Sequence, residues 1–492
     1  MKGYKRIAAC AAAVMMAAAM TACGDTDSGT TSSNGGSTDN STDGAVTTVM
    51  GKDLEESQQQ VIDDIASDSK ADDRVLTNTN IKWFSFWDIN PTSSEDKDIG
   101  VDLALFKSKY NGTIEYISTT WNTKFDDLAA AVLAHESPDF CGADDMDMFP
   151  KGAIKEMIEP IDDYINFDSD LWKDVKTACD QFVYHGGHYV GVSRVDPAYI
   201  WIYNKTVLQE LGIEEPAEMF ANGTWNWETM GDMCKAFADP ENDKYALDAW
   251  YYENALTEST GIPLIGMENG EIVNNIEDPR IAKVQEYMYE LQKNNVVYPK
   301  HENGWNVRGG KDKWGTGLAS GLTLFYPIGF WAIEDAPSAT APFGDISAGD
   351  VMFAPVPCDK DSDAQYIPSR VHGFCIVKNA PNPEGVAAFL DCTRYAEADP
   401  KAKEVTYDQL KNDYGWTDEM IEMREKIYEM AAEHPVFEFA QGINQDVSDI
   451  TDAILKATMH PSDPHSWTET VQENKKALDW LIEDAQKKVA DQ

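Results

Sequence analysis

Residues 189–205, Tyr-Val-Gly-Val-Ser-Arg-Val-Asp-Pro-Ala-Tyr-Ile-Trp-Ile-Tyr-Asn-Lys, constrain the fold of this chain more than any other segment. Two apolar runs, 189–192 and 199–203, flank a polar stretch that contains Asp196 and Pro197. Such an interrupted extended path suits a crossing of the chain between two lobes, and it equally suits a strand, loop and strand within one sheet. The segment alone leaves both interpretations open.

Its surroundings favour the crossing. Before it, the pattern predicts strands over 81–87, 113–118 and 140–143, with helices over 101–110 and 124–134. After it, the pattern predicts helices over 206–211, 225–237 and 280–293, strands over 321–331, 350–357 and 373–377, a helix from 383, and a mostly helical tail from 417. The expected strand 321–331 contains a turn at 326–329. Strands that alternate with helices indicate sheets covered by helices on both faces, so the predicted fold class is α/β in two lobes.

The N-terminus has the features of an export signal. Lys2, Lys5 and Arg6 precede an apolar run over 7–20, and small residues lead up to Cys23. This segment resembles the lipobox of bacterial lipoproteins, whose cysteine is diacylated, for example with palmitate, and becomes the new N-terminus. The resemblance implies a signal peptide over 1–22 and a protein held by Cys23 on the extracytoplasmic face of the cell membrane. The alternative is an ordinary cleaved signal with an incidental cysteine.

The composition limits the partners of the chain. A length of 492 residues predicts two to four domains. Residues 24–48 are almost free of large apolar side chains, so 23–79 are expected to form a flexible tether that ends in a short helix. The net charge of −45, without a basic stripe, argues against nucleic acid as a partner. The spacing of the cysteines fits no zinc or redox motif, and their pairing stays open.

Several motifs, in order, are similar to those of extracellular solute-binding lipoproteins of ABC transporters, carbohydrate type (maltose-binding-protein-like, family 1). They are the helix and Pro-Asp over 125–139, Glu-Pro-Ile-Asp-Asp-Tyr-Ile over 159–165, Tyr-Asn-Lys over 203–205, Gly-Thr-Trp-Asn-Trp-Glu over 223–228, and 373–390 with its Asn-Pro-Glu-Gly. The usual glycine before Pro-Asp is absent here, as is the Gly-Lys-Ala before the apolar strand, which puts a ligand site mapped by analogy in doubt.

The resemblance implies a type II periplasmic-binding-protein-like fold, with an interlobe cleft and hinge crossings. We expect residues 80–196 and 345–396 in lobe 1, and 197–344 and 397–492 in lobe 2. The implied function is to bind a sugar or oligosaccharide in the cleft, as a monomer, and to deliver it to the permease of an ABC importer, without catalysis.

A sugar receptor needs aromatic plates and polar side chains that satisfy hydroxyl groups. Residues of both kinds follow the predicted strands, at the crossing and in the second lobe. The candidate ligand-binding residues are Trp87, Asp88, Trp121, Asn122, Asp144, Asp145, Asp196, Tyr199, Trp250, Tyr251, Trp331 and Arg370. Each aromatic residue could instead pack in the core, and Asp88, Asp144 and Asp145 could instead cap helices.

Two alternatives stay open. An exported glycoside hydrolase would use paired carboxylates, which this acidic chain could supply anywhere, but the strand order predicts no eightfold barrel. A peptide or metal receptor of the same fold is the other. No Gly-x-Ser-x-Gly, His-Glu-x-x-His or EF-hand pattern is present in the sequence, so we expect no catalytic residue, cofactor or metal.

Overall fold

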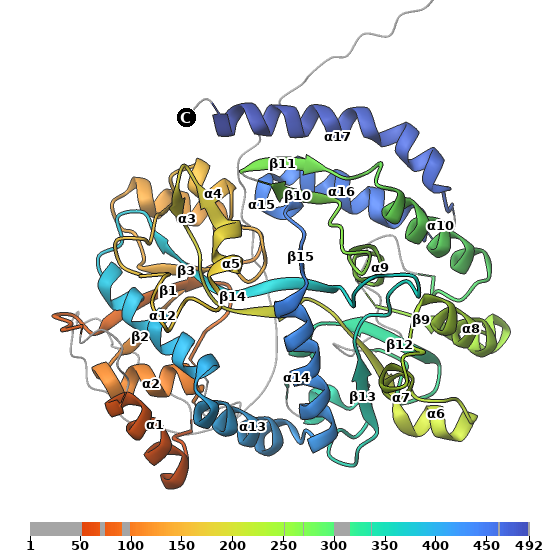
Figure 1. The fold of residues 1–492 in the computed structure, drawn as a ribbon, viewed down its shortest axis with the longest axis horizontal. Helices are drawn as coiled ribbons and strands as arrows, with labels where there is room; N and C mark the ends of the chain where they lie inside the picture. The colour runs from red at the N-terminus through yellow and green to blue at the C-terminus, as the bar shows by residue number, and fades with distance from the viewer. Residues whose placement is uncertain are drawn as a thin grey trace, which may run out of the picture. The chain divides into compact units, whose positions relative to one another are not determined.

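The computed structural model describes residues 52–68, 74–90, 99–249, 251–268, 270–299, 315–335, 337–460 and 463–490. All of them belong to one compact unit, residues 46–492. Two larger sheets and two short hairpins organise these residues (Figure 1). The expectations for residues 1–22, Cys23, most of the tether and Trp250 lie outside the described residues.

The large sheet has the strand order β15-β14-β3-β1-β2, and β4 and β7 also pair with β14. Its strands are β1 (Asn80–Ser85), β2 (Thr113–Ser118), β3 (Phe140–Gly142), β4 (Ile158–Glu159), β7 (Gly191–Pro197), β14 (Ile367–Val377) and β15 (Pro435–Phe437). Strands β3, β1 and β2 are parallel, as the alternation of strands and helices predicts. Strand β14 runs antiparallel to β3 and β7, so it joins a late segment of the chain to the first strands.

The small sheet has the order β13-β8-β12-β9. Its strands are β8 (Ile200–Asn204), β9 (Tyr245–Leu247), β12 (Thr323–Ile328) and β13 (Val351–Ala354). The hairpins are β5 (Val183–Tyr184) with β6 (Gly187–His188), and β10 (Ile265–Glu268) with β11 (Glu271–Asn274). Strand β7 therefore belongs to one sheet and β8 to the other, which confirms a crossing of the chain within residues 189–205.

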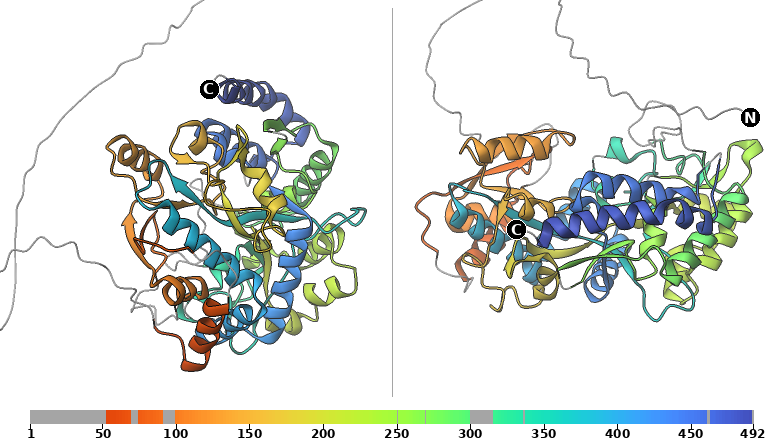
Figure 2. Two further views of the ribbon diagram at one scale, coloured as in Figure 1. Left: turned by 60° about the vertical axis from the view of Figure 1, so that its left-hand side comes forward. Right: turned by 90° about the horizontal axis from the view of Figure 1, so that it is seen from above.

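Helices cover both sheets. Around the large sheet lie α1 (Glu56–Asp68), α2 (Val101–Tyr110), α3 (Lys124–Leu133), α4 (Lys151–Ile154), α5 (Lys176–Cys179), α12 (Pro383–Ala398) and α13 (Pro400–Tyr414). The remaining helices are α6 (Lys205–Leu211), α7 (Pro216–Ala221), α8 (Trp227–Phe237), α9 (Tyr252–Glu258), α10 (Pro279–Lys293), α11 (Pro337–Thr340), α14 (Asp418–Glu433), α15 (Ala440–Ile443), α16 (Gln445–Ala457) and α17 (Trp467–Ala490). Figure 2 shows α17 lying along α16, which it contacts together with β11.

The helix ends follow from local sequence. Asn111 and Gly212 end α2 and α6 in the left-handed conformation, with φ of 51° and 67°. The side chain of Asn226 accepts hydrogen bonds from the second and third residues of α8, which completes a capping box. Asn382 caps α12 directly before Pro383, whose fixed φ suits the first helical position.

Asp139 explains why Pro-Asp precedes β3. Its carboxylate is almost fully buried and accepts hydrogen bonds from the backbone N–H of Lys82 in β1, at 2.7 Å, and of Asn382 before α12, at 2.6 Å. The side chain of Asn382 donates in turn to the carbonyl of Asn80, at 2.9 Å. One acidic side chain thereby ties the first strand of the large sheet to a helix that follows much later in the chain.

Two details of the sequence-based expectations are wrong. Strand β7 continues through Pro197, because Pro197 lies opposite Ser369 of β14, so the break falls at Ala198 and Tyr199. No turn interrupts β12 at Pro327, which lies opposite Trp201. The pairing of β12 with β9 ends at Phe325, so the missing N–H of Pro327 disrupts no ladder on that side.

The pairing of β13 bears on the expected lobe boundaries. Residues 351–354 pair with β8 in the small sheet, although they were expected in lobe 1. Helix α13 contacts α2 and α12, although its residues were expected in lobe 2. The lobe boundaries stay a prediction, and these pairings favour a change of lobe between β13 and β14 instead of at 345.

The cysteines of the described residues are free thiols: Cys141, Cys179, Cys234, Cys358, Cys375 and Cys392. All except Cys358 are buried, and burial raises the pKa of Cys179 to about 12. The described fold therefore relies on its apolar core and not on cross-links.

Candidate functional site

Exposed aromatic rings gather where β1 and β2 end. Phe86, Trp87 and Trp121 are 38%, 37% and 48% exposed, which is unusual for rings of this size. The rings of Phe86 and Trp121 meet edge to face, with centroids 5.2 Å apart. The Lys124 ammonium lies 3.9 Å from the Trp121 ring centroid. These rings present apolar faces at the carboxyl ends of parallel strands, where open α/β sheets bind ligands.

Lys124, the first residue of α3, links these rings to the loop after β3. Its ammonium contacts Asp145 at 3.2 Å and Asp147 at 2.6 Å. Burial would lower the pKa of Lys124, but the two carboxylates outweigh burial and raise it. A small cavity of about 20 Å³ is lined here by Trp87, Lys124, Asp144 and Asp145. The loops after β1, β2 and β3 and the start of α3 thus bring polar and aromatic side chains together at the end of the sheet.

A second cluster forms around Arg370 of β14, and we call it the Arg370 group. It consists of Asp144, Asp145, Tyr199, Tyr251, Glu258 and Arg370. The rings of Tyr199 and Tyr251 stack with centroids 5.3 Å apart and an interplanar angle of 26°. The Arg370 guanidinium lies 6.0 Å from the Tyr199 ring centroid, and its Nη2 donates to the carbonyl of Ala198 at 3.4 Å.

The electrostatics confirm that these residues are neighbours. Burial raises the pKa of Asp144 to about 7, and Asp145 adds to the shift while Arg370 opposes it. The pKa of Arg370 is raised because Tyr199, Asp145 and Asp144 together outweigh the effect of burial. Arg370 is also among the groups that act on Tyr251 and Glu258. The large sheet supplies Asp144, Asp145 and Arg370, and α9 and the residue before it supply Glu258 and Tyr251.

Eight of the candidate residues lie in the Arg370 group or beside it. Asp144, Asp145, Tyr199, Tyr251 and Arg370 come together in the Arg370 group, and Trp87 and Trp121 stand beside it at the strand ends. Trp331 is 42% exposed and folds over Gly329, close to the Ala198 carbonyl that accepts from Arg370.

The remaining candidates are placed differently. Asp88 accepts hydrogen bonds from the backbone and side chain of Asn90, at 2.9 and 3.0 Å, so it stabilises its own turn. Asn122 is exposed beside Trp121. Asp196 forms an ion pair with Arg194, which also contacts Glu397, and its charge acts on Tyr428, so it belongs to a different cluster from Tyr199. Ligand contact stays a prediction for all of these residues.

Sequence reasoning missed two buried acids. Glu258, the last residue of α9, is 4% exposed, and burial raises its pKa well above the usual range. Glu438, after β15, accepts hydrogen bonds from the N–H groups of Leu264, Ile265 and Ala440 and has a pKa of about 7, because burial outweighs these bonds. Acidic side chains usually lie in solvent, so the sequence carries no signal that either of these two is buried.

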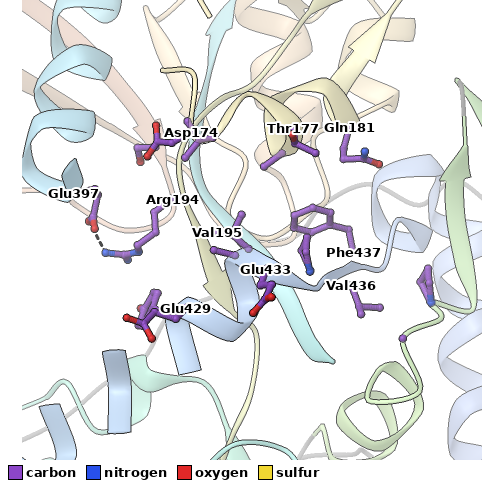
Figure 3. A pocket seen from close by; sticks show the side chains of 18 of the residues that line it. Asp174, Thr177, Gln181, Arg194, Val195, Glu397, Glu429, Glu433, Val436 and Phe437 are labelled. Atoms are coloured by element: carbon purple, nitrogen blue, oxygen red, sulfur yellow. Dashed lines mark hydrogen bonds and ion pairs between the residues drawn. The ribbon is translucent and has the colours of Figure 1, made fainter. Parts of the chain in front are cut away.

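A larger pocket, of about 700 Å³, lies apart from the Arg370 group (Figure 3). Its walls come from β7, α12, α14 and β15, and Figure 3 shows Arg194 pointing to Glu397 while Glu429 and Glu433 project from α14. The arginines that line it each already contact a carboxylate; they are Arg194, Arg280, Arg394 and Arg424. Paired charges have little to gain from a ligand, so pocket size alone does not mark the functional site.

Two further searches of the described residues are negative. No group of three or more His, Cys, Asp or Glu side chains there has an arrangement that could hold a metal ion. None of the described helices is both long enough and apolar enough to cross a bilayer.

The chain belongs to the family of bacterial extracellular solute-binding proteins, whose family model matches residues 103–406, more than half of the sequence. A comparison with curated protein sequences finds no match. Solved structures with the same two-lobe α/β fold are found at low sequence identity.

Three of these solved structures illustrate the likeness. The GacH receptor of Streptomyces glaucescens, also solved with acarbose, aligns with a TM-score of 0.58 at 15% identity over 82% of this chain and 98% of its own. The sugar-binding protein MalE from Xanthomonas citri has the same four values. The extracellular solute-binding protein from Staphylococcus aureus in complex with maltose gives 0.57 and 12%, over 83% and 99%. At such identities the likeness concerns the fold, which is the two-lobe α/β fold expected from the sequence.

Proposed function

We propose that this protein is a lipid-anchored extracellular receptor that binds a sugar or oligosaccharide at the Arg370 group and delivers it to an ABC importer. The observation that carries the proposal is the convergence of polar side chains from both sides of a chain crossing, next to exposed aromatic rings at the strand ends. Aromatic rings suit the apolar faces of a sugar, and Asp, Tyr and Arg side chains suit its hydroxyl groups.

The proposal includes a membrane anchor at Cys23 and a permease partner. Its support is the lipobox-like sequence before Cys23 together with the family assignment. In a bacterial host, Cys23→Ala should abolish labelling with radioactive palmitate and release the protein from membranes, whereas Cys10→Ala in the leader should change neither. Labelling that survives Cys23→Ala would contradict the anchor.

Ligand binding is tested first by a thermal-shift screen against neutral and charged glycans. A ligand at 100 times its dissociation constant stabilises the folded state by about 2.7 kcal/mol. A bound glycan should also compact the protein in small-angle X-ray scattering, because closure of two lobes on a ligand is a hinge motion. Binding without compaction would argue against lobe closure, and no stabilisation by any glycan would refute sugar binding.

Trp331 offers a sharp test of the site. Trp331→Ala should weaken glycan binding at least tenfold without lowering stability much, because the ring is 42% exposed. Trp480→Ala is the matched control, since Trp480 is 63% exposed on α17 and away from the Arg370 group. Equal affinity of the two variants would remove Trp331 from the site.

Catalysis is not part of this proposal. The buried acids Asp144 and Glu258 could in principle serve a hydrolase, so pure protein should be assayed with chromogenic glycosides. Turnover that is lost in Asp144→Asn or Glu258→Gln would favour the hydrolase over the receptor.

A further inference from the structure

We propose that the ligand of the Arg370 group carries a carboxylate, as an acidic sugar such as a uronate does, and that Arg370 binds this carboxylate with Glu258 as a neutral hydrogen-bond donor beside it. This inference rests on the proposed function and narrows its ligand class.

The first observation is the unsatisfied guanidinium of Arg370. A guanidinium has five N–H donors, yet the Arg370 side chain makes one long hydrogen bond, 3.4 Å to Ala198, and no ion pair within the described part of the chain. Arg194, which is also partly buried, and Arg394, which is more deeply buried, each contact a carboxylate. Charges removed from water are normally paired, so the donors of Arg370 lack the anion that its counterparts have.

The second observation is Glu258, which is 4% exposed and whose side chain forms no hydrogen bond or ion pair with any described residue. Several fully enclosed polar side-chain atoms in the described structure lack a hydrogen-bond partner, and the carboxyl oxygens of Glu258 are not among them. These oxygens therefore keep some contact with solvent. Burial and the neighbouring Glu438 raise its pKa well above the usual range. Burial therefore favours the protonated form of Glu258, whose O–H has no acceptor among the described residues and can donate to a ligand.

The other acids nearby act on the charge of Arg370, but none of those described forms an ion pair with it. Asp196, which lies opposite Arg370 across β7 and β14, pairs with Arg194. Asp145 shares Lys124 with Asp147. Glu438 is occupied by backbone N–H groups. The pKa of Asp144 is raised to about 7, mainly by burial, so this group is mostly protonated at pH 6.

The two tyrosines extend the donor character of the site. Burial raises the pKa of both Tyr199 and Tyr251, so their hydroxyl groups stay protonated at physiological pH. Their stacked rings also provide an apolar wall beside Arg370. A guanidinium, a neutral carboxyl and phenol hydroxyls together form a donor-rich surface, and a planar carboxylate that accepts two parallel N–H bonds fits it best.

The experiment is isothermal titration calorimetry at pH 6.0 with glucuronate, galacturonate and their disaccharides, each against its neutral methyl ester. The acids should bind at least tenfold more tightly than their esters. Arg370→Gln should remove this preference. Arg370→Lys should lose at least tenfold in affinity for the acids, because lysine keeps the charge but lacks the planar guanidinium that donates two parallel N–H bonds. Arg280→Gln, which changes an arginine paired with Asp278 elsewhere, is the control and should bind like the wild type.

The role of Glu258 has a separate readout. Glu258→Gln should retain the affinity at pH 6.0, since its amide N–H replaces the acid O–H, whereas Glu258→Ala should lose about tenfold. Ionisation of Asp144, whose pKa is about 7, places negative charge beside the ligand, so wild-type affinity for the acids should fall at least tenfold from pH 6 to 8. Other charged groups lie near these acids: Arg370, Asp145 and Glu438 face them, and Lys456 and Asp452 of α16 act on Tyr251. The double variant Asp144→Asn/Glu258→Gln should flatten the dependence of affinity on pH, which would assign this dependence to Asp144 and Glu258.

The outcomes separate this inference from the proposed function. Equal affinity for acids and esters, binding of neutral sugars alone, or an unchanged preference in folded Arg370→Lys would each overturn the carboxylate proposal and leave sugar binding intact. If no glycan of either kind binds, both the inference and the proposed function fail.

Discussion

Replacing Asp139 by alanine tests how the large sheet is held together. The substitution leaves two backbone donors without an acceptor, the N–H groups of Lys82 and Asn382. An unsatisfied buried donor costs about 1–3 kcal/mol. The donor of Asn382 is buried and that of Lys82 is partly buried, so the gross loss is about 2 plus about 1 kcal/mol.

Part of this loss is offset by removing a buried charge. Burial raises the pKa of Asp139 despite the two N–H contacts, which means that the ionised carboxylate is partly destabilised in the fold. We therefore expect Asp139→Ala to lower the free energy of unfolding by about 2–3 kcal/mol, and Asp139→Asn, which keeps one acceptor oxygen, by about 1–2 kcal/mol.

The assay is urea unfolding followed by tryptophan fluorescence and circular dichroism at pH 7. The exposed Asp163→Ala is the control and should shift the free energy by less than about 0.5 kcal/mol. If Asp139→Ala is as stable as this control, burial of the charge cancels its hydrogen bonds and the role assigned to Pro-Asp is refuted.

Three further substitutions test other parts of the fold. Asn226→Ala should cost about 1 kcal/mol in urea unfolding through loss of the α8 cap, and an unchanged midpoint would contradict that role. Arg194 outweighs burial and holds the pKa of Glu397 below its usual range, so the stability lost in Glu397→Gln should be largest above about pH 5 and should disappear only as pH falls below the ordinary glutamate pKa and through the lowered pKa of the folded state. A loss constant with pH would refute the charge argument. Gly442→Ala would place a Cβ against the backbone carbonyl of Phe149, so it should lower the unfolding midpoint more than Gly266→Ala does, where the added Cβ makes only ordinary van der Waals contacts; equal midpoints would contradict this close approach.

The order of elements could be predicted well from the sequence. Helix α2 and strand β2 have the expected bounds, because Asn111 and Gly112 separate a helical pattern from an alternating one. The start of α12 after Asn382 was likewise predictable, since an N-cap acts within a few residues, whereas α8 begins at Trp227 and not at the expected residue 225. Local chemistry decides these features.

Long-range pairing could not be predicted in the same way. The sequence of 351–354 reads as a strand, but nothing local tells whether it pairs with β8 or with the large sheet. A proline such as Pro327 usually indicates a turn. The strand tolerates its missing N–H because the pairing with β9 has already ended at Phe325, which the local sequence does not reveal.

The candidate site shows the same division. Tyr199 could be placed at the crossing, and Arg370 just before the predicted strand 373–377, by their positions in the chain, and the structure brings them together. Asp196 is three residues from Tyr199, yet its side chain is held by Arg194, because the chain breaks from the strand between them. Glu258 could not be found at all, since its burial depends on the packing of α9 against distant segments.

The late position of β14 also has a consequence for the order of folding. This strand contacts β3, β4, β7 and β15, so the large sheet lacks its central pairing until residues 367–377 have emerged from the ribosome. Contacts between such distant segments form slowly, because the entropic cost of closing a long loop comes before the free energy gained from the contacts. An N-terminal fragment that ends before β14 would leave the edge of β3 open. For a polypeptide that is threaded across a membrane before it folds, as proposed here, this delay keeps the chain export-competent until nearly all of it has been made.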